Sequence, residues 1–201
     1  MSVAALGSRN PTEDAILVAA REALAGEPYD RVTIDGIARR AFVSRTTVYF
    51  YFPNKRAVVD RLIQRSFADM HDAGAPYFEG EGDPRAELRA ALAGVVEVVD
   101  RDASILRLAL WLYGREDQIP AEWAPHIQQL VRAGARRIAR DQGRGLAPDD
   151  IPARTSALAL CAMVERHVGM EIIRAGRAGR DGHDSIRVLS ELWWRAVYAK
   201  P

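Results

Sequence analysis

Basic residues gather in one stretch of this 201-residue chain, and their spacing indicates chemistry with an anion. Between Ile37 and Arg65 there are seven arginines and lysines and one acid, Asp60, whereas the whole chain has a formal net charge of only +1. Lys55 and Arg56 stand at the expected start of a helix, where the helix dipole disfavours cations. A phosphate group would be attracted by these side chains and by the free N–H groups of that helix start. The alternative interpretation is a solvated basic face without a binding role.

Two short helices are expected to position these residues. Thr33 can cap the first, whose apolar residues recur at three- and four-residue spacing. They are Ile34, Ile37, Ala38 and Ala41. Ser44 is a good N-cap for the second, which runs from Arg45 to Phe52 before Pro53 closes the segment. The pattern predicts a helix-turn-helix with its turn at residues 42–44.

Residues 46–52, Thr-Thr-Val-Tyr-Phe-Tyr-Phe, also have the composition of a strand, because β-branched and aromatic residues favour sheets. A strand needs a partner, however. The rest of the chain offers helical periods and no second convincing strand. In combination with the basic residues, the helical interpretation therefore favours a motif that binds DNA.

These residues carry a resemblance to a known family. Ile37, Ala38, Ser44, Thr47, Tyr49, Phe52 and Lys55 match the DNA-binding signature of the TetR family of bacterial transcription regulators. The phrase SRTTVYFYFPNKRAV is especially similar to that of one member, and the similarity spans nearly the whole chain. The sequence departs from the family pattern at Phe42, where members usually carry glycine. Glycine suits a turn with positive φ, which is costly for an aromatic residue.

The resemblance implies an all-α fold with an N-terminal helix-turn-helix DNA-binding domain, followed by a helical ligand-binding and dimerisation domain. On the second helix of the motif, we expect Arg45, Thr46 and Tyr49 to contact base edges. Contacts to the DNA backbone are expected from Thr47, Tyr51 and Lys55. Thr33 and Phe50 complete the set of expected DNA-binding residues.

The chain is expected to have four parts. Residues 1–10 form a loose arm, 11–56 the DNA-binding domain, 57–73 a linking helix and 84–201 the effector-binding and dimerisation domain. Gly80, Gly82 and two prolines make residues 74–84 the best candidate for a loop between domains. Helices are expected at about 12–24 and 54–72, and beyond the loop at about 84–100, 103–114, 120–141, 152–175 and 184–199.

Several classes of protein are disfavoured by composition. The longest apolar runs are far shorter than the roughly 20 residues that a membrane span requires, so we expect a cytoplasmic protein without membrane contact. A single cysteine, Cys161, excludes an internal disulfide and a cysteine-cluster metal site. The four histidines are scattered, and no nucleotide-binding glycine loop is present. We therefore expect no metal, no cofactor and no catalytic residue.

A hydrophobic small molecule is the expected effector, bound among apolar side chains of the helical domain. The candidate lining residues are Trp111, Tyr113, Trp123, Ile127, Cys161, Val164 and Trp193. The alternative is that each of them packs in the core. In the similar family member the counterparts of Cys161 and Val164 are amides that face a channel, so this pocket should be more apolar.

The last two helices carry apolar stripes that, by the resemblance, form a four-helix interface in a homodimer. A core role within one subunit is the alternative. The stripes comprise Ala157, Leu158, Leu160, Cys161, Val164 and Val168 on one helix and Ile186, Leu189, Leu192, Trp193 and Val197 on the other.

The resemblance thus implies a homodimeric transcription regulator of the repressor type, released from a palindromic operator by its effector. The half-sites would lie about 34–36 Å apart. The alternative function is a helical module that binds small molecules or partners and has lost DNA binding.

Overall fold

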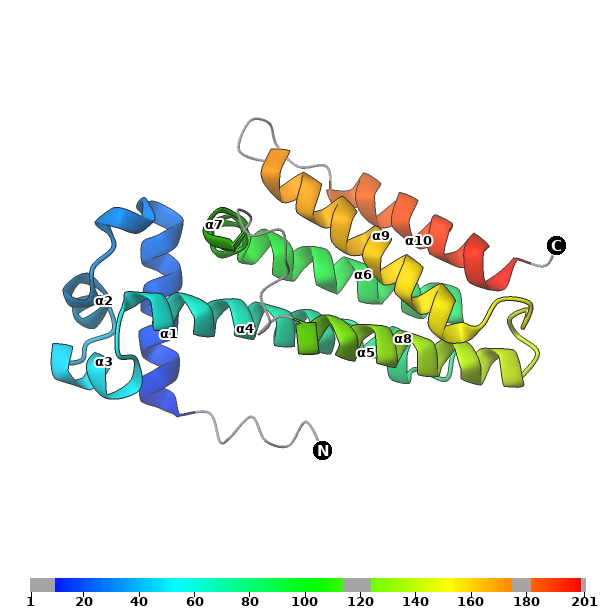
Figure 1. Cartoon of the computed structure of the whole chain (residues 1–201), viewed down its shortest axis with the longest axis horizontal. Helices are drawn as coiled ribbons and strands as arrows, with labels where there is room; N and C mark the ends of the chain where they lie inside the picture. The colour runs from blue at the N-terminus through cyan, green and yellow to red at the C-terminus, as the bar shows by residue number, and fades with distance from the viewer. Residues whose placement is uncertain (1–9, 114–123, 175–181, 200–201) are drawn as a thin grey trace. The chain divides into compact units, whose positions relative to one another are not determined.

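The structure is a computed structural model that describes residues 10–113, 124–174 and 182–199. Every regular element within these ranges is a helix (Figure 1). The chain divides into two compact units. Unit 1 comprises residues up to Arg65 together with Ser104–Leu112, and unit 2 comprises Ser66–Ala103 and the chain from Tyr113 onward. The helix expected at residues 45–52, rather than the alternative strand, is confirmed, and so is the expected all-α fold.

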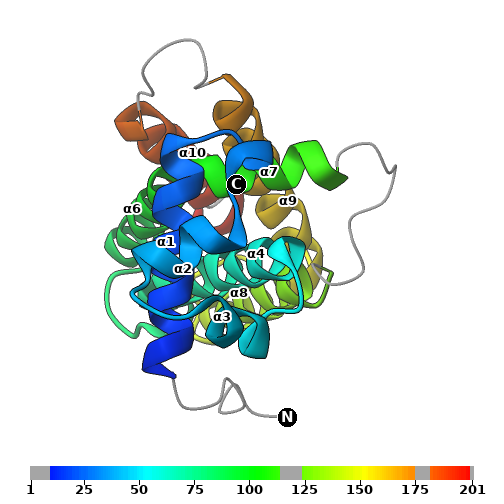
Figure 2. The ribbon, with the colours of Figure 1, turned by 90° about the vertical axis from the view of Figure 1, so that its left-hand side faces the viewer.

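Unit 1 holds the helix-turn-helix. Its elements are α1 (Pro11–Gly26), the 3-10 turn η2 (Tyr29–Arg31), α2 (Ile34–Arg40), α3 (Arg45–Tyr51), the first half of α4 (Lys55–Ala73) and most of α7 (Ala103–Tyr113). α2 lies against both α1 and α3 (Figure 2). The fully buried side chains include Ile16 and Leu17 of α1, Ile37 of α2 and Val48 of α3. A shared apolar core therefore holds helices that are too short to be stable alone.

Side-chain caps begin these helices where the sequence indicates. Thr33 Oγ1 accepts a hydrogen bond from Gly36 N at 3.0 Å, and Ser44 Oγ accepts one from Thr47 N at 3.0 Å. Asn10 Oδ1 accepts from Thr12 N at 3.0 Å, which starts α1 at Pro11, one residue earlier than expected. The caps predicted at Thr33 and Ser44 are confirmed.

The turn between α2 and α3 requires a left-handed residue. Phe42 has φ 55°, and it follows Ala41, the C-terminal cap of α2. Phe42 N donates to Arg39 O at 3.3 Å and Val43 N donates to Ala38 O at 3.0 Å. These two bonds form a Schellman motif, in which glycine usually occupies the left-handed position. An aromatic residue thus occupies the left-handed position of this turn.

Unit 2 is a helical bundle of α5 (Ala75–Glu79), α6 (Pro84–Arg101), α8 (Ala124–Gly143), α9 (Ala153–Arg174) and α10 (Gly182–Tyr198) with the second half of α4. α8 packs on α9, and α10 packs on α6 and α9 (Figure 1). Its core includes Tyr77, Leu88, Ile138, Ala157, Leu160, Leu189 and Trp193. Four expected helices, those near 84–100, 103–114, 152–175 and 184–199, are confirmed within two residues at each end.

The loop expected at residues 74–84 is wrong in its first half, which forms α5. Gly74 and Pro76 suggested a break, but proline is tolerated in the first turn of a helix. α5 buries Tyr77 and packs on α6 and α8. The helix expected at about 120–141 corresponds to α8, and its expected start at residue 120 lies outside the described residues.

Around Tyr77 lies a buried polar network. The Arg137 side chain is 1% exposed, and its Nε donates to Asp141 Oδ2 at 2.6 Å. Arg137 Nη1 lies 2.6 Å from Glu87 Oε2 and 2.7 Å from Tyr77 O. Tyr198 OH donates to Asp141 Oδ2 at 2.7 Å. The network joins α5, α6, α8 and α10.

Two tyrosines of the network share a hydrogen bond, with Tyr77 OH 2.9 Å from Tyr198 OH. Trp193 Nε1 donates to Tyr77 OH at 3.2 Å, and their rings meet edge to face. Burial raises the pKa of both tyrosines, so both hydroxyls stay protonated at neutral pH. They can therefore act as hydrogen-bond donors at the centre of the bundle.

Removal of the Arg137 charge should destabilise the bundle. The substitution Arg137→Met leaves the buried Asp141 carboxylate without its cation, which costs about 3–5 kcal/mol of the free energy of unfolding. Denaturant-induced unfolding followed by circular dichroism measures the change. Arg136→Met, at an exposed neighbour on the same helix, is the control and should change it by less than about 0.5 kcal/mol. Equal unfolding midpoints for the two variants would contradict the role of the network.

Candidate nucleic-acid interface

α3 has two different faces. Val48 is 0% exposed and Phe52, directly after the helix, is also buried, so this side anchors α3 to the unit 1 core. The opposite face consists of the exposed side chains Arg45, Thr46, Tyr49 and Phe50. Their positions i, i+1, i+4 and i+5 place them on one side of a helix with 3.6 residues per turn. The structure thus brings together the three residues expected to contact base edges, with Phe50 beside them.

Arg45 is held over this face by contacts with Tyr49 and Asp35. Its Nη2 donates to Tyr49 OH at 3.3 Å, and its guanidinium carbon lies 5.4 Å from the centroid of the Tyr49 ring. Nη1 lies 3.4 Å from Asp35 Oδ2 of α2. The Arg45 and Asp35 side chains are 61% and 52% exposed, so this ion pair is weak and exchangeable. The guanidinium is therefore oriented in advance but remains available to a ligand.

Thr47 and Tyr51, which were expected to contact the DNA backbone, also form contacts within the protein. Thr47 Oγ1 lies 2.8 Å from Ser44 Oγ, within the N-cap of α3. Tyr51 is half-buried, and its ring packs edge to face on Phe50 with centroids 5.1 Å apart. Thr33 is exposed at the start of α2. Their contacts with DNA stay predictions.

Lys55 is anchored inside unit 1. Its Nζ donates to Tyr29 O at 2.8 Å and to Val32 O at 2.9 Å, and it lies 4.0 Å from the centroid of the Tyr29 ring. The ammonium thus ties the start of α4 to η2. A lysine has three N–H donors, so one is left for a phosphate. This anchor could not be predicted from the sequence, because Tyr29 and Val32 contribute backbone carbonyls that any residue would supply.

The electrostatic reason for expecting an anion at this helix start needs correction. The cation of Lys55 is compensated by the two carbonyls and the ring of Tyr29. Arg56 pairs with Asp60 at 3.0 Å within α4. Asn54 Oδ1 accepts from Ala57 N at 2.9 Å and caps the helix. Compensation for the two cations therefore comes from within the chain.

Acids elsewhere in unit 1 also pair with the basic stretch. Arg40 lies 2.6 Å from Glu27, Arg61 lies 2.9 Å from Glu13, and Arg65 pairs with Asp14. In contrast to these arginines, Arg39 is exposed and forms no ion pair with another described residue. The positive charge that remains most available therefore lies near the turn, at Arg39 and Arg45.

The expected ligand-lining residues are divided between the units. Trp111 belongs to unit 1 and is 61% exposed. Trp123 lies outside the described residues, as does the side chain of Tyr113. In unit 2, Ile127, Cys161 and Val164 are half-buried, and Trp193 is buried against Tyr77. Burial raises the pKa of the Cys161 thiol to about 11, so the thiol stays protonated and apolar.

A cavity of about 270 Å³ lies elsewhere in unit 2, between the end of α8, residues 148–151 and the end of α10. None of the seven expected ligand residues lines it. The binding of a ligand by those seven residues stays a prediction.

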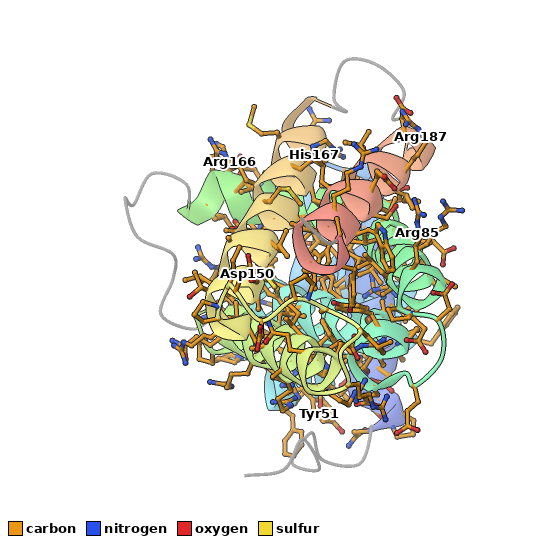
Figure 3. The ribbon with its side chains drawn as sticks, turned by 90° about the vertical axis from the view of Figure 1, so that its right-hand side faces the viewer. Tyr51, Arg85, Asp150, Arg166, His167 and Arg187 are labelled. Carbon is orange, nitrogen blue, oxygen red and sulfur yellow. The ribbon has the colours of Figure 1, made fainter. Side chains whose placement is uncertain are left out.

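The apolar stripes expected at a dimer interface separate into two sets. One set packs in the core of unit 2, with Ala157, Leu160, Leu189, Trp193 and Val197 buried and Cys161, Val164, Val168 and Ile186 half-buried against them. Leu158 of α9 and Leu192 of α10 are exposed. On the same pair of helices, His167 lies between α9 and α10 (Figure 3), with Nε2 3.0 Å from Ser185 Oγ. The larger part of the stripes therefore serves the core, and the exposed leucines are what a partner subunit can cover.

Within the described ranges, no three His, Cys, Asp or Glu side chains gather closely enough to hold a metal ion. Over the same ranges, no helix combines the length and the hydropathy needed to cross a membrane.

Two family profiles match the chain. The profile described as "Bacterial regulatory proteins, tetR family" matches residues 16–62, which include α2, α3 and the start of α4. The profile described as "Transcriptional regulator EthR, C-terminal domain" matches residues 88–199. The helix-turn-helix and most of unit 2 thus each match a part of such regulators.

Individual relatives agree with these profiles. The HTH-type transcriptional regulator EthR of Mycolicibacterium smegmatis is 27% identical over 195 residues, which cover 95% of this chain and 88% of that protein. The DNA-binding transcriptional repressor TetR of Mycobacteroides abscessus is 31% identical over 146 residues, covering 72% and 68%. The solved structure of SmeT, repressor of the Stenotrophomonas maltophilia multidrug efflux pump SmeDEF, superposes with a TM-score of 0.71 at 18% identity, covering 95% and 94%.

Loss of the Lys55 anchor should destabilise unit 1. Lys55→Met removes two charge-assisted hydrogen bonds and a cation–π contact, so we expect a loss of about 1–3 kcal/mol in the free energy of unfolding. Thermal and denaturant unfolding measure it. Arg31→Met, at an exposed residue of η2, is the control. An unchanged unfolding midpoint for Lys55→Met would show that the anchor contributes nothing to stability.

Proposed function

This chain belongs to the TetR family of bacterial transcriptional regulators, and from that membership we propose that it is a repressor that binds an operator as a homodimer. The observation that carries the proposal is the exposed face of α3. It presents one oriented guanidinium, two hydroxyls and two aromatic rings on a helix that is anchored by Val48. Such a helix fits the major groove of B-DNA, and its side chains can contact base edges.

In this proposal Arg45, Thr46 and Tyr49 read the bases. An arginine recognises guanine through O6 and N7, and the bond to Tyr49 presents the Arg45 guanidinium for this contact. Arg45 can leave its weak ion pair with Asp35 and contact a base at little cost in free energy. The Asp35 carboxylate is half-exposed and stays hydrated when the pair is broken. Arg45 therefore acts as a residue of specificity.

Phosphate contacts set the position of the helix. Arg39, which is exposed and forms no ion pair with a described residue, supplies the strongest sequence-independent attraction. Thr33, Thr47, Tyr51 and the remaining N–H of Lys55 complete the contacts to the DNA backbone. The structure-stabilising roles of Thr47 and Lys55 are compatible with this, since a hydroxyl and an ammonium each have hydrogen-bonding capacity left.

The dimer is proposed to form through α9 and α10. Leu158 and Leu192 are large, apolar and exposed, and the alternating exposed alanines Ala159, Ala162 and Ala196 allow close approach of a second copy. A two-fold axis would place one α3 on each half of a palindromic operator, with half-sites about 34–36 Å apart.

A hydrophobic small molecule is proposed to release the protein from DNA. The half-buried Ile127, Cys161 and Val164 of α8 and α9 are apolar side chains on neighbouring helices, which suits a ligand with few polar groups. Release requires the ligand to bind the form with low DNA affinity more tightly than the DNA-bound form. Equal ligand affinity with and without operator, measured by calorimetry, would exclude this coupling.

A second function, a binding module without DNA contact, is disfavoured by the exposed and oriented Arg45. The first experiment is a selection of DNA sequences from a random library by the purified protein, followed by titrations at several salt concentrations. A repressor enriches a palindrome and binds it with strong salt dependence. Failure to enrich any sequence would favour the module.

Two arginines should affect DNA binding differently. Arg45→Ala should lose about 1–3 kcal/mol of discrimination at one base pair of the half-site. Arg39→Ala should weaken binding to all sequences and reduce the salt slope by about 0.9 per monomer. Fluorescence anisotropy against the selected operator and its single-base variants measures both. Arg89→Ala, at an exposed residue of α6, is the control that should leave both quantities unchanged.

The dimer should depend on the exposed leucine of α9. Leu158→Glu places like charges against each other across a two-fold interface, so we expect the variant to be monomeric at concentrations where the natural protein is dimeric. Sedimentation velocity measures the state. Leu146→Glu, at an exposed leucine outside both helices, is the matched control. A dimer that resists Leu158→Glu but not Leu146→Glu would place the interface elsewhere.

A further inference from the structure

Phe42 combines two unfavourable features. Its φ of 55° is a left-handed conformation, which costs an L-residue roughly tenfold in conformational population relative to glycine. Its side chain is 96% exposed, so the ring gains nothing from burial. Strain of this kind persists where a residue has another use, and an observed outlier is a reason to look for that use.

Packing within the described structure does not account for an aromatic side chain at position 42. The backbone of Phe42 supplies one bond of the Schellman motif, to Arg39 O, which a glycine would supply equally well. With almost no area of the ring covered, truncation to a smaller side chain removes no packing. An interaction with something outside the subunit would account for the aromatic group.

The surroundings of Phe42 define the partner. Arg39 and Arg45, the two most available cations near the turn, lie three residues before and after it. A partner at this place must carry negative charge and also offer an apolar group to an aromatic ring. Duplex DNA satisfies both conditions, because thymine presents a 5-methyl group in the major groove beside the phosphates.

The position of Phe42 also suits a base contact. In helix-turn-helix proteins the N-terminal residues of the recognition helix reach the base edges. Phe42 stands two residues before the cap of α3, Ser44, and three before the first residue of that helix, Arg45. The exposed ring thus belongs to the turn that leads into the N-terminal end of α3.

We propose that Phe42 recognises the methyl group of a thymine in each operator half-site and is a specificity-determining residue of this chain. The inference rests on the proposed DNA binding and deepens it. Replacement of thymine by deoxyuridine removes only that methyl group, so it tests the contact without changing base pairing.

The experiment uses the full-length protein and the operator enriched from a random library. Each thymine of the half-site is replaced in turn by deoxyuridine, symmetrically in both halves. At one position the natural protein should lose about fourfold in affinity per half-site, which is the value of one buried methyl-sized group, or about 15-fold for the dimer. Phe42→Gly and Phe42→Asn should bind more weakly and show no loss at that position.

Both variants suit the left-handed conformation, so their unfolding midpoints should equal or exceed that of the natural protein. A lost methyl preference is then not a folding defect. Val18→Ala, at an exposed apolar residue of α1 away from the turn, should keep both the affinity and the preference.

The outcomes separate the two proposals. If the natural protein selects an operator but every deoxyuridine penalty persists in Phe42→Gly and Phe42→Asn, the Phe42 contact is refuted and the repressor function stands. Absence of any deoxyuridine penalty in the natural protein has the same meaning. If no sequence is enriched, both proposals fail.

Discussion

The shortness of α3 is the constraint on which the DNA-binding surface depends. A seven-residue helix is not stable alone, so its existence and its rotation about its axis are set by the burial of Val48 and Phe52 in the unit 1 core. Once these two side chains are buried, Arg45, Thr46, Tyr49 and Phe50 must face outward. The Ser44 cap and the left-handed turn at Phe42 fix where the helix starts. The chemistry of the exposed face is thus a consequence of two buried residues that are not part of it.

The elements of the motif were predictable because local signals and tertiary packing agree. Thr33 and Ser44 each leave a capping signature in the sequence, and the helical periods of unit 2 are long enough to recognise. α5 was not predictable, because a five-residue helix with Gly74, Pro76 and Gly80 around it is held by the burial of Tyr77 rather than by its own propensity.

The sequence alone did not show which basic residues of the site are paired with acids. The excess of basic residues between Ile37 and Arg65 is visible in the sequence, but its neutralisation depends on acids from α1 and from Glu27 that approach only in the folded unit. The anchor of Lys55 on two backbone carbonyls leaves no sequence trace at all. Folding therefore narrows a broad basic stretch to a few available cations near the turn.

The network around Arg137 also has a consequence for how this chain can change during evolution. Arg137, Asp141, Glu87 and Tyr198 come from three helices, and the loss of one member leaves another buried and unsatisfied. Asp141 Oδ1 is already buried without a hydrogen-bond partner among the described residues, so little tolerance is left. A variant with a single substitution at one of these positions would be destabilised. Replacement of the network by an apolar core therefore requires several substitutions together. The four residues of the network are therefore expected to change together or not at all, whereas residues on the exposed faces of the same helices can change one at a time.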